Sequence, residues 1–319
     1  MRKLSLARSG GFVAVVVLSA AALGGCAQKP AAAIGPLTED TLRQEAGELP
    51  SSPAWSPHHA KAQPRANAPA GAASSARTFV LGHSVLGKPI TMHVFGASGS
   101  ATLIFAGIHG DEPVSSQLAR RMYDYIKSNP SVLGGRSVAF ILEANPDGLA
   151  ARTRGNANRV DCNRNFPATN WKPSAANARY SGGSRPASEP ETQAIIKAVD
   201  MLRPASIVSI HTISGGRFCN NYDGPASALA AAMAKSNSYP PKATIGYPTP
   251  GSFGTWAGID RNIPTITLEL PDEQKNASQW WSGNRGALLT AIRHGEAVQV
   301  ARDADKMPPA PMYPLRGGR

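Results

Sequence analysis

A histidine and a glutamate stand three residues apart in His109-Gly-Asp-Glu112, and two apolar segments further along the chain end near His211 and Glu269. A catalytic zinc ion commonly takes three protein ligands, histidine and glutamate among them, and leaves a fourth position open. His109, Glu112 and His211 are therefore candidate ligands of one zinc ion. Glu269 remains as an unattached carboxylate, the general base that metal-assisted hydrolysis of an amide needs.

The segments around the first pair place it on a loop at the end of a strand. Thr102–Phe105 has the length and composition of a buried strand, and Val114–Lys127 has helical periodicity. His109 and Glu112 lie between them. Ligands often occupy such a loop, because the open end of an α/β sheet leaves room for a metal while the sheet holds the backbone. A His-x-x-Glu spacing is common by chance, so the metal hypothesis depends on the strands that follow.

Three later segments read as buried strands, and two of them carry the remaining candidates. These strands are predicted over Ser137–Glu143, Ala205–Thr212 and Pro264–Pro271, of which the second contains His211 and the third Glu269. Strands that alternate with helices predict an α/β fold with a mixed, mostly parallel central sheet and helices on both faces. In such a sheet His211 and Glu269 come to the same edge as the first pair.

Other elements are predicted from local patterns. Residues 78–95 alternate around a Gly-Lys pair, which is typical of an opening hairpin, and Asn145-Pro-Asp-Gly148 has the chemistry of a turn. Ser188 followed by Glu191 predicts the start of a helix with Ser188 as its N-cap. A last helix is predicted over Gly283–Val298.

A polar stretch rich in arginine and asparagine runs from Arg152 to Pro167 with neither a helical nor a strand period. Guanidinium and amide donors gathered in one loop suit the binding of carboxylates, because arginine presents a fork that matches a carboxylate. A solvated basic loop is the alternative. Cys162 lies in this stretch, and it either pairs with Cys219 in an oxidising compartment or stays a buried free thiol, which is the favoured alternative.

The N-terminal residues have the pattern of an export signal. A basic start precedes the apolar run Phe12–Leu23, which is too short to span a bilayer comfortably, and Leu23-Gly-Gly-Cys26 resembles a bacterial lipobox. An ordinary secretory signal with an incidental Cys26 is the alternative. Either way we expect an exported, periplasmic protein. Lipid on Cys26 would anchor it to a membrane, and the absence of Asp after this cysteine favours the outer membrane.

Composition divides the chain into four parts. Residues 1–26 form the expected lipoprotein signal peptide, 27–76 an Ala- and Pro-rich disordered tether, 77–300 the catalytic domain, and 301–319 a basic, Pro-rich tail. The formal net charge of +12 suits an anionic polymer such as cell wall or lipid headgroups. A nucleic-acid partner is not expected, because the basic residues are spread out without a stacking motif or a reading helix.

Residues 77–298 resemble the zinc carboxypeptidase family and, within it, the murein peptide amidase branch. The motifs that carry the resemblance are His109-Gly-Asp-Glu112, Asn145-Pro-Asp-Gly148, Val160-Asp-Cys-Asn-Arg-Asn-Phe-Pro167, Ser209-Ile-His211 and Ile266-Thr-Leu-Glu269. Together and in this order they are highly specific. The Asn-Asn-Tyr-Asp-Gly-Pro segment at 220–225 is also similar to that branch.

The resemblance implies a role for each site residue. His109, Glu112 and His211 would bind zinc, and Glu269 would be the general base that acts on a zinc-activated water. Asn163 and Arg164 match the pair that grips the terminal carboxylate of the substrate. Asp161 matches an acid that orients the first zinc histidine from outside the metal shell.

Two features of the family are harder to place. The arginine that stabilises the oxyanion is expected to be Arg154, with Arg152 as its rival. The active-site tyrosine of the family has no sure counterpart. Trp256 lies in roughly the right place before Glu269, but it has no hydroxyl.

Members of this branch hydrolyse the bond between γ-D-glutamate and meso-diaminopimelate in peptidoglycan stem peptides. We therefore expect a zinc metallopeptidase that acts on stem peptides or muropeptides. A general metallocarboxypeptidase and an N-acyl amino acid deacylase are alternatives with the same metal chemistry. An inactive, wall-binding lipoprotein is an alternative of another class, and the presence of Glu269 together with all the ligands argues against it.

Overall fold

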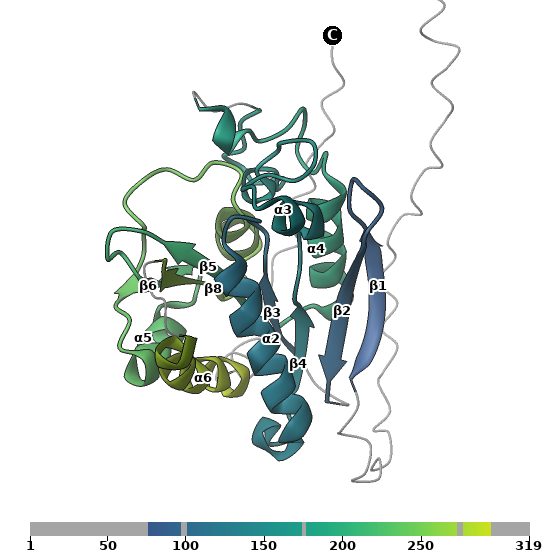
Figure 1. Ribbon diagram of the computed structural model, residues 1–319. Coiled ribbons are helices and arrows are strands. Elements are labelled where there is room, and N and C mark those ends of the chain that lie inside the picture. Colours follow the sequence, from purple (N-terminus) through teal and green to yellow (C-terminus); the bar gives the residue numbers. More distant parts are fainter. Residues whose placement is uncertain (1–75, 97–100, 174–176, 273–276, 295–319) are drawn as a thin grey trace, which may run out of the picture. The chain divides into compact units, whose positions relative to one another are not determined.

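The computed structural model describes residues 76–96, 101–173, 177–272 and 277–294 (Figure 1). The predicted leader, nearly all of the predicted tether and the predicted tail lie outside these residues. Within them the chain forms an eight-stranded sheet in the order β1-β2-β4-β3-β5-β8-β6-β7. The strands are β1 Arg77–His83, β2 Pro89–Phe95, β3 Ala101–Ala106, β4 Ser137–Ile141, β5 Ser206–Ile213, β6 Cys219–Asp223, β7 Pro241–Lys242 and β8 Thr265–Pro271.

The centre of the sheet is parallel, and an antiparallel pair joins it to each flank. β4, β3, β5 and β8 pair in parallel, whereas β2 joins β4 and β6 joins β8 in antiparallel fashion. The central strands are apolar over nearly their full length because helices cover both of their faces. The predicted fold class, α/β with a mixed, mostly parallel sheet, is confirmed.

Two helical layers enclose the sheet. The longer helices and short helical segments are α2 Pro113–Ser128, η1 Pro130–Leu133, α3 Pro146–Ala151, η2 Cys162–Arg164, η3 Ala178–Tyr180, α4 Pro190–Leu202, α5 Ser227–Asn237, η4 Gly254–Asp260 and α6 Ala277–Arg293. One apolar core contains α2, α5 and α6 with one face of the sheet, and a second contains α4, η2 and η4 with the opposite face. Among the described residues, no helix has the length and apolar character needed to cross a membrane.

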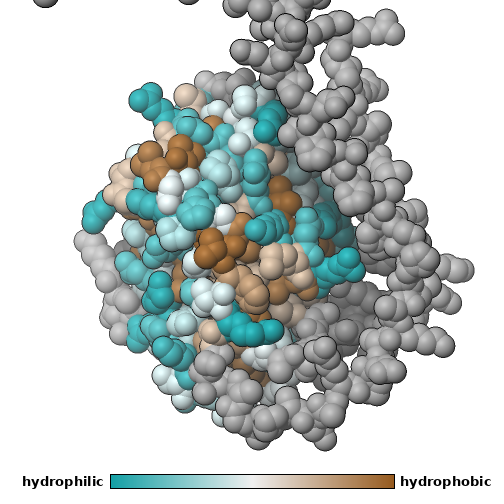
Figure 2. All heavy atoms as spheres, turned by 90° about the vertical axis from the view of Figure 1, so that its right-hand side faces the viewer, coloured by the Kyte–Doolittle hydropathy of each residue, from teal (hydrophilic) through white to brown (hydrophobic). Residues whose placement is uncertain are grey.

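The antiparallel hairpin of β1 and β2 forms one flank of the sheet. Viewed from that side, the surface shows separate apolar patches among hydrophilic side chains (Figure 2). Val80 in β1 and Leu86 in the turn are exposed. The turn is held to the rest of the domain, since the backbone N–H of Val85 donates to Glu191 and that of Leu86 donates to Asp147.

Three local predictions were wrong, each for a visible reason. The Asn145–Gly148 motif starts helix α3 rather than a turn, because the side chain of Asn145 accepts from the N–H of Gly148. Ser188 does not cap α4, since its hydroxyl donates to Glu189, which occupies the N-cap position. The last helix begins at Ala277, before Gly283. A Cβ atom at position 283 would lie 3.2 Å from Cα of Asn237, so this glycine permits close packing of α6 on α5.

The two cysteines of the described part of the chain do not pair. Cys162 lies in η2 and Cys219 in β6, and both are buried free thiols. The favoured prediction for these residues is confirmed. Burial raises the pKa of the Cys219 thiol to about 11, so this group stays protonated at neutral pH.

Candidate active site

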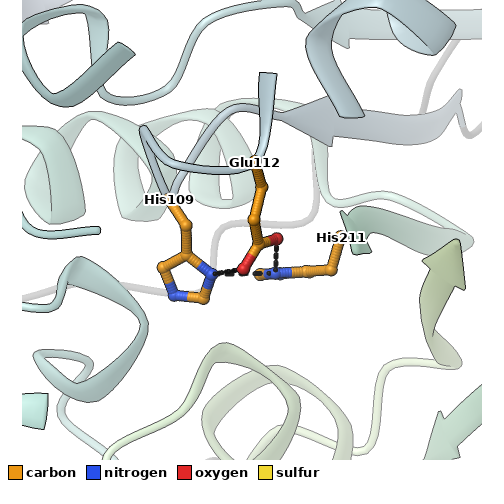
Figure 3. A group of neighbouring side chains, drawn as sticks. All are labelled: His109, Glu112 and His211. Atoms are coloured by element: carbon orange, nitrogen blue, oxygen red, sulfur yellow. Dashed lines mark hydrogen bonds and ion pairs between the residues drawn. The ribbon is translucent and has the colours of Figure 1, made fainter. Parts of the chain in front are cut away.

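His109 and Glu112 lie on the loop that leaves β3 and enters α2, as predicted. Nδ1 of His109 lies 2.8 Å from Oε1 of Glu112 (Figure 3). The second carboxylate oxygen of Glu112 accepts from the backbone N–H of Thr212 at 2.9 Å. Both side chains are buried, so the loop directs a histidine nitrogen and a carboxylate into the interior at one point.

His211 joins this pair from β5, the central strand beside β3. Its Nδ1 lies 3.1 Å from Nδ1 of His109 and 3.2 Å from Oε2 of Glu112 (Figure 3). Three groups that bind cations thus converge, and their ligand atoms all lie within 4.8 Å of one another. Two ring nitrogens that face each other beside a carboxylate repel unless a proton or a metal ion lies between them. Their chemistry and convergence fit a divalent ion such as zinc.

Asp161 holds the ring of His109 from the side away from the cluster. Its Oδ1 lies 3.0 Å from Nε2 of His109, which leaves Nδ1 free to face Glu112 and His211. Although burial works against the charged form, His109 and Arg154 hold the pKa of the Asp161 carboxyl well below its ordinary value. A carboxylate on the outer nitrogen of a metal histidine fixes its tautomer and raises its basicity.

The structure separates Arg154 from its rival Arg152. Nε of Arg154 donates to Oδ2 of Asp161 at 2.8 Å, and its Nη1 lies 3.4 Å from Oε1 of Glu112. Its guanidinium also lies over the ring of Tyr180, 5.1 Å from the centroid. Arg152 instead ends α3 with a positive φ of 53° and is exposed. Of these two arginines, Arg154 is the one that lines the site.

Asn163 and Arg164 lie in the short helical turn η2 and line the same cavity. The side-chain oxygen of Asn163 accepts from the N–H of Phe253 at 2.9 Å, and Nη1 of Arg164 donates to the carbonyl of Asn163 at 2.7 Å. Arg164 is buried, and it is one of the residues that line the cavity. These contacts hold an amide and a guanidinium in the cavity that contains the metal cluster.

Glu269 comes from β8, where it pairs with His211 of β5. Its side chain is buried and lines the cavity without binding to the cluster. Burial raises the pKa of the Glu269 carboxyl well above its ordinary value, and the neighbouring charge of Glu112 acts in the same direction. All the candidate ligands and the candidate base thus meet at one edge of the sheet.

The cavity contains a tyrosine that the sequence analysis missed. Tyr247 lies at its mouth, between Arg164 and Arg217, and is 42% exposed. Trp256 is not part of the lining, because it is buried in η4, where its ring stacks on Phe166. Tyr247 is therefore the tyrosine in the lining of this cavity. An isolated tyrosine in the Gly- and Pro-rich segment 246–251 was the available indication.

The floor of the cavity comes from the 220–225 segment, which the sequence analysis singled out without predicting a strand there. Strand β6 contributes Asn221 and Asp223 to it, beside Thr267 of β8. These polar residues did not stand out as a strand, since polar side chains are depleted in buried strands. The full lining contains His109, Glu112, Arg154, Asn163, Arg164, His211, Thr212, Asn221, Asp223, Ala243, Thr244, Ile245, Tyr247, Thr249, Ser252, Gly254, Thr267 and Glu269.

Sequence comparison relates this arrangement to known enzymes. The model of the zinc carboxypeptidase family matches residues 70–223. Murein peptide amidase A of Escherichia coli K12 is 38% identical over 202 residues, which cover 60% of this chain and 79% of that protein. Murein peptide amidase A of Vibrio campbellii is 37% identical over 203 residues, covering 60% of this chain and 77% of that protein.

Solved structures show the same relationship. The murein-tripeptide amidase of Escherichia coli O157 superimposes with a TM-score of 0.55 at 32% identity, and the match covers 71% of this chain and 96% of that one. Bovine thrombin-activatable fibrinolysis inhibitor superimposes with a TM-score of 0.60 at 18% identity, over 69% of this chain and 90% of that one. The second likeness concerns the fold alone.

Proposed function

This chain belongs to the zinc carboxypeptidase family, and on that premise we propose that it hydrolyses the amide bond between γ-D-glutamate and meso-diaminopimelate in peptidoglycan stem peptides. It is a zinc-dependent metallopeptidase, with His109, Glu112 and His211 as the residues that would hold the ion. The observation that carries the proposal is the position of Glu269 opposite His211, in a cavity that also holds Asn163 and Arg164.

Zinc at this site would supply Lewis acidity, which polarises the scissile carbonyl and lowers the pKa of a water molecule. Glu269 acts as the general base: its carboxylate takes the proton of the attacking water and passes it to the leaving nitrogen. Arg154 supplies a positive charge beside the ligands, where it stabilises the negative charge that develops on the carbonyl oxygen. Asp161 keeps both His109 and Arg154 in place through one carboxylate.

The substrate is held by its terminal carboxylate. The guanidinium of Arg164 is oriented by its hydrogen bond to the carbonyl of Asn163. The side chain of Asn163 is held in turn by the backbone N–H of Phe253. The phenol of Tyr247 lies at the mouth of the same cavity and donates a further hydrogen bond to bound substrate. These residues select a chain end, because a free carboxylate is what their donors match.

Peptidoglycan is proposed as the source of the substrate on the basis of the relatives. Two proteins that are 37% and 38% identical to this chain over the aligned residues are named murein peptide amidase A. The predicted export signal and the net charge of +12 agree with an anionic substrate outside the cytoplasm. We place the protein in the periplasm, with a lipid on Cys26 as its anchor to the outer membrane.

The proposed reaction is tested by mass spectrometry of a purified muropeptide. L-Ala-γ-D-Glu-meso-diaminopimelate is incubated with the zinc-loaded protein, with and without a chelator. Release of diaminopimelate that the chelator abolishes and added zinc restores is the expected result. An intact tripeptide beside hydrolysis of ordinary acyl amino acids would instead indicate a general carboxypeptidase or a deacylase. No hydrolysis of either, by a folded and zinc-loaded protein, would indicate an inactive site.

The proposed anchor has its own test. Cells that express the full chain are grown with a radiolabelled fatty acid, and the membrane fractions are separated. Label on the full chain in the outer-membrane fraction, and none on a Cys26→Ala variant, is expected. A processed but unlabelled protein in the soluble periplasmic fraction would establish the ordinary secretory signal instead.

A further inference from the structure

The cavity extends along the sheet from the metal cluster towards Asp223. In the antiparallel pairing of β6 with β8, Cys219 lies opposite Glu269, Asn221 opposite Thr267 and Asp223 opposite Thr265. Alternate residues of a strand face the same side, so Asn221 and Asp223 share the face of Glu269. Asp223 is four residues beyond the level of Glu269, which places it roughly 13 Å further along the sheet.

The backbone of η4 packs against Asp223. A Cβ atom on Gly254 would lie 2.2 Å from Oδ2 of Asp223, and one on Gly258 would lie 2.4 Å from its Cβ. Glycine at these positions therefore leaves the space that the carboxylate occupies. Gly254 and Asp223 both line the cavity, so the Asp223 carboxylate is accessible to a ligand that enters it.

The side chain of Asp223 has no hydrogen bond or ion pair with any of the residues that the structure describes. Asp161 and Glu112, by comparison, each have several partners, whereas the side chain of Glu269, like that of Asp223, has none among the described residues. Burial without a compensating charge raises the pKa of the Asp223 carboxyl to about 6. A bound cation would supply the missing partner.

We propose that Asp223 binds an ammonium group carried by the side chain of the leaving amino acid, an inference that deepens and rests on the proposed function of this cavity. The interval of about 13 Å runs from the level of Glu269 to that of Asp223. One hydrogen bond of about 3 Å from Glu269 to the leaving nitrogen and another from Asp223 to the ammonium leave roughly 7 Å between these two substrate nitrogens. An extended diamino-acid side chain covers that distance. Asn221 and Thr267, which lie beside Asp223, offer an amide and a hydroxyl to a carboxylate next to the ammonium.

Binding of reaction products tests the inference without turnover. Titration calorimetry compares meso-diaminopimelate with 2-aminopimelate, which keeps the distal carboxylate but lacks the ammonium, on the zinc-loaded protein. We expect diaminopimelate to bind at least about tenfold more tightly, the effect of one charge-assisted hydrogen bond in a half-buried site. Asp223→Asn should reduce that preference to about one, and the exposed Asp124→Asn should leave it unchanged.

Equal binding of the two ligands by the unmodified protein, or no binding of diaminopimelate, would overturn the inference. A preference that survives in a folded Asp223→Asn protein would do the same. The comparison on the unmodified protein needs no variant, so a folding defect in Asp223→Asn does not remove the test. An undigested muropeptide beside an Asp223-dependent preference for the ammonium would refute the proposed function and leave this inference intact.

Discussion

Glu269 of β8 lies opposite His211 of β5 in the parallel register of the sheet. Side chains at paired positions of neighbouring strands face the same side, so the candidate base stands next to a candidate ligand without belonging to the cluster. The register of two strands whose paired residues are far apart in sequence thus sets the distance between base and metal. Shifting that register by one residue would turn Glu269 to the other face of the sheet.

Glu269→Gln should lower kcat about 10²- to 10⁴-fold, because the amide cannot take a proton from water. Zinc content and thermal stability should stay close to those of the unmodified protein. Release of diaminopimelate from the tripeptide, followed by liquid chromatography, gives the rate. Glu143→Gln is the matched control, since that side chain is 54% exposed. Full activity in Glu269→Gln would remove Glu269 from the mechanism.

Asp161→Asn should weaken zinc binding about 10- to 100-fold, because His109 loses the carboxylate that orients its ring. The variant should also melt at a lower temperature at limiting zinc, since an ion that binds only the folded state stabilises it. Competition with a zinc chelator measures the affinity. Asp200→Asn, at an exposed surface pair with Arg261, is the control. An unchanged affinity would mean that Asp161 serves Arg154 alone.

Arg154→Met should reduce kcat by about 10²-fold or more, a typical loss when one oxyanion-stabilising donor is removed. Arg152→Met should keep nearly full activity, because Arg152 is exposed at the end of α3. The two variants remove the same group two positions apart. Steady-state rates on the tripeptide measure the loss of kcat in each variant. A larger loss in Arg152→Met than in Arg154→Met would assign the role to Arg152.

Arg164→Met should raise KM for substrates that end in a free carboxylate, with little change for the corresponding C-terminal amides. Loss of a bidentate pair in a mostly buried site costs about 2 kcal/mol, or roughly 30-fold in kcat/KM. Rates on one acyl dipeptide and its amide measure the difference. If both substrates lose activity equally, Arg164 supports the loop rather than the substrate terminus.

Asp223 should make the folded protein less stable as pH rises from about 4 to about 6. Burial raises its pKa from 3.8 to about 6, so the folded state holds this proton more tightly than the unfolded chain does. The stabilisation is complete below the pKa that Asp223 has in the unfolded chain. It is lost as pH rises through the higher pKa that Asp223 has in the folded protein. Gly254, Gly258 and Thr265, which pack beside or pair with this residue, do not titrate.

Urea unfolding of the unmodified protein and Asp223→Asn checks this prediction at fixed zinc concentration. Relative to the unmodified protein, the variant should be more stable at about pH 7.5 than at about pH 4. The difference between the two proteins cancels the pH dependence of every other group. A difference that does not vary with pH would show that the Asp223 pKa is the same in both states.

The local parts of the site could be predicted from the sequence. His109 and Glu112 are three residues apart on one loop, and Asn163 and Arg164 are adjacent, so short-range geometry brings each pair together. The apolar runs that became β3, β4, β5 and β8 were also visible, because burial on both faces needs continuous apolar residues. The motifs along the chain then indicated the family.

Local patterns were weaker where the surroundings override them. β6 has the sequence Cys-Asn-Asn-Tyr-Asp, which is polar for a strand, yet pairing with β8 satisfies its backbone. Trp256 was considered for the place of the active-site tyrosine because of its position in the chain. Packing of η4 buried that ring against Phe166 and left Tyr247 at the cavity mouth.

By itself the sequence determined the class of chemistry, the candidate ligands and the α/β architecture, because residue types and apolar periodicity are local properties. The tertiary structure decided which groups meet. Strand order placed Glu269 beside His211, the left-handed backbone of Arg152 turned that residue away while Arg154 reached Asp161, and the register of β6 placed Asp223 on the cavity floor. These relations join residues distant in sequence or depend on packing, and no local pattern encodes them.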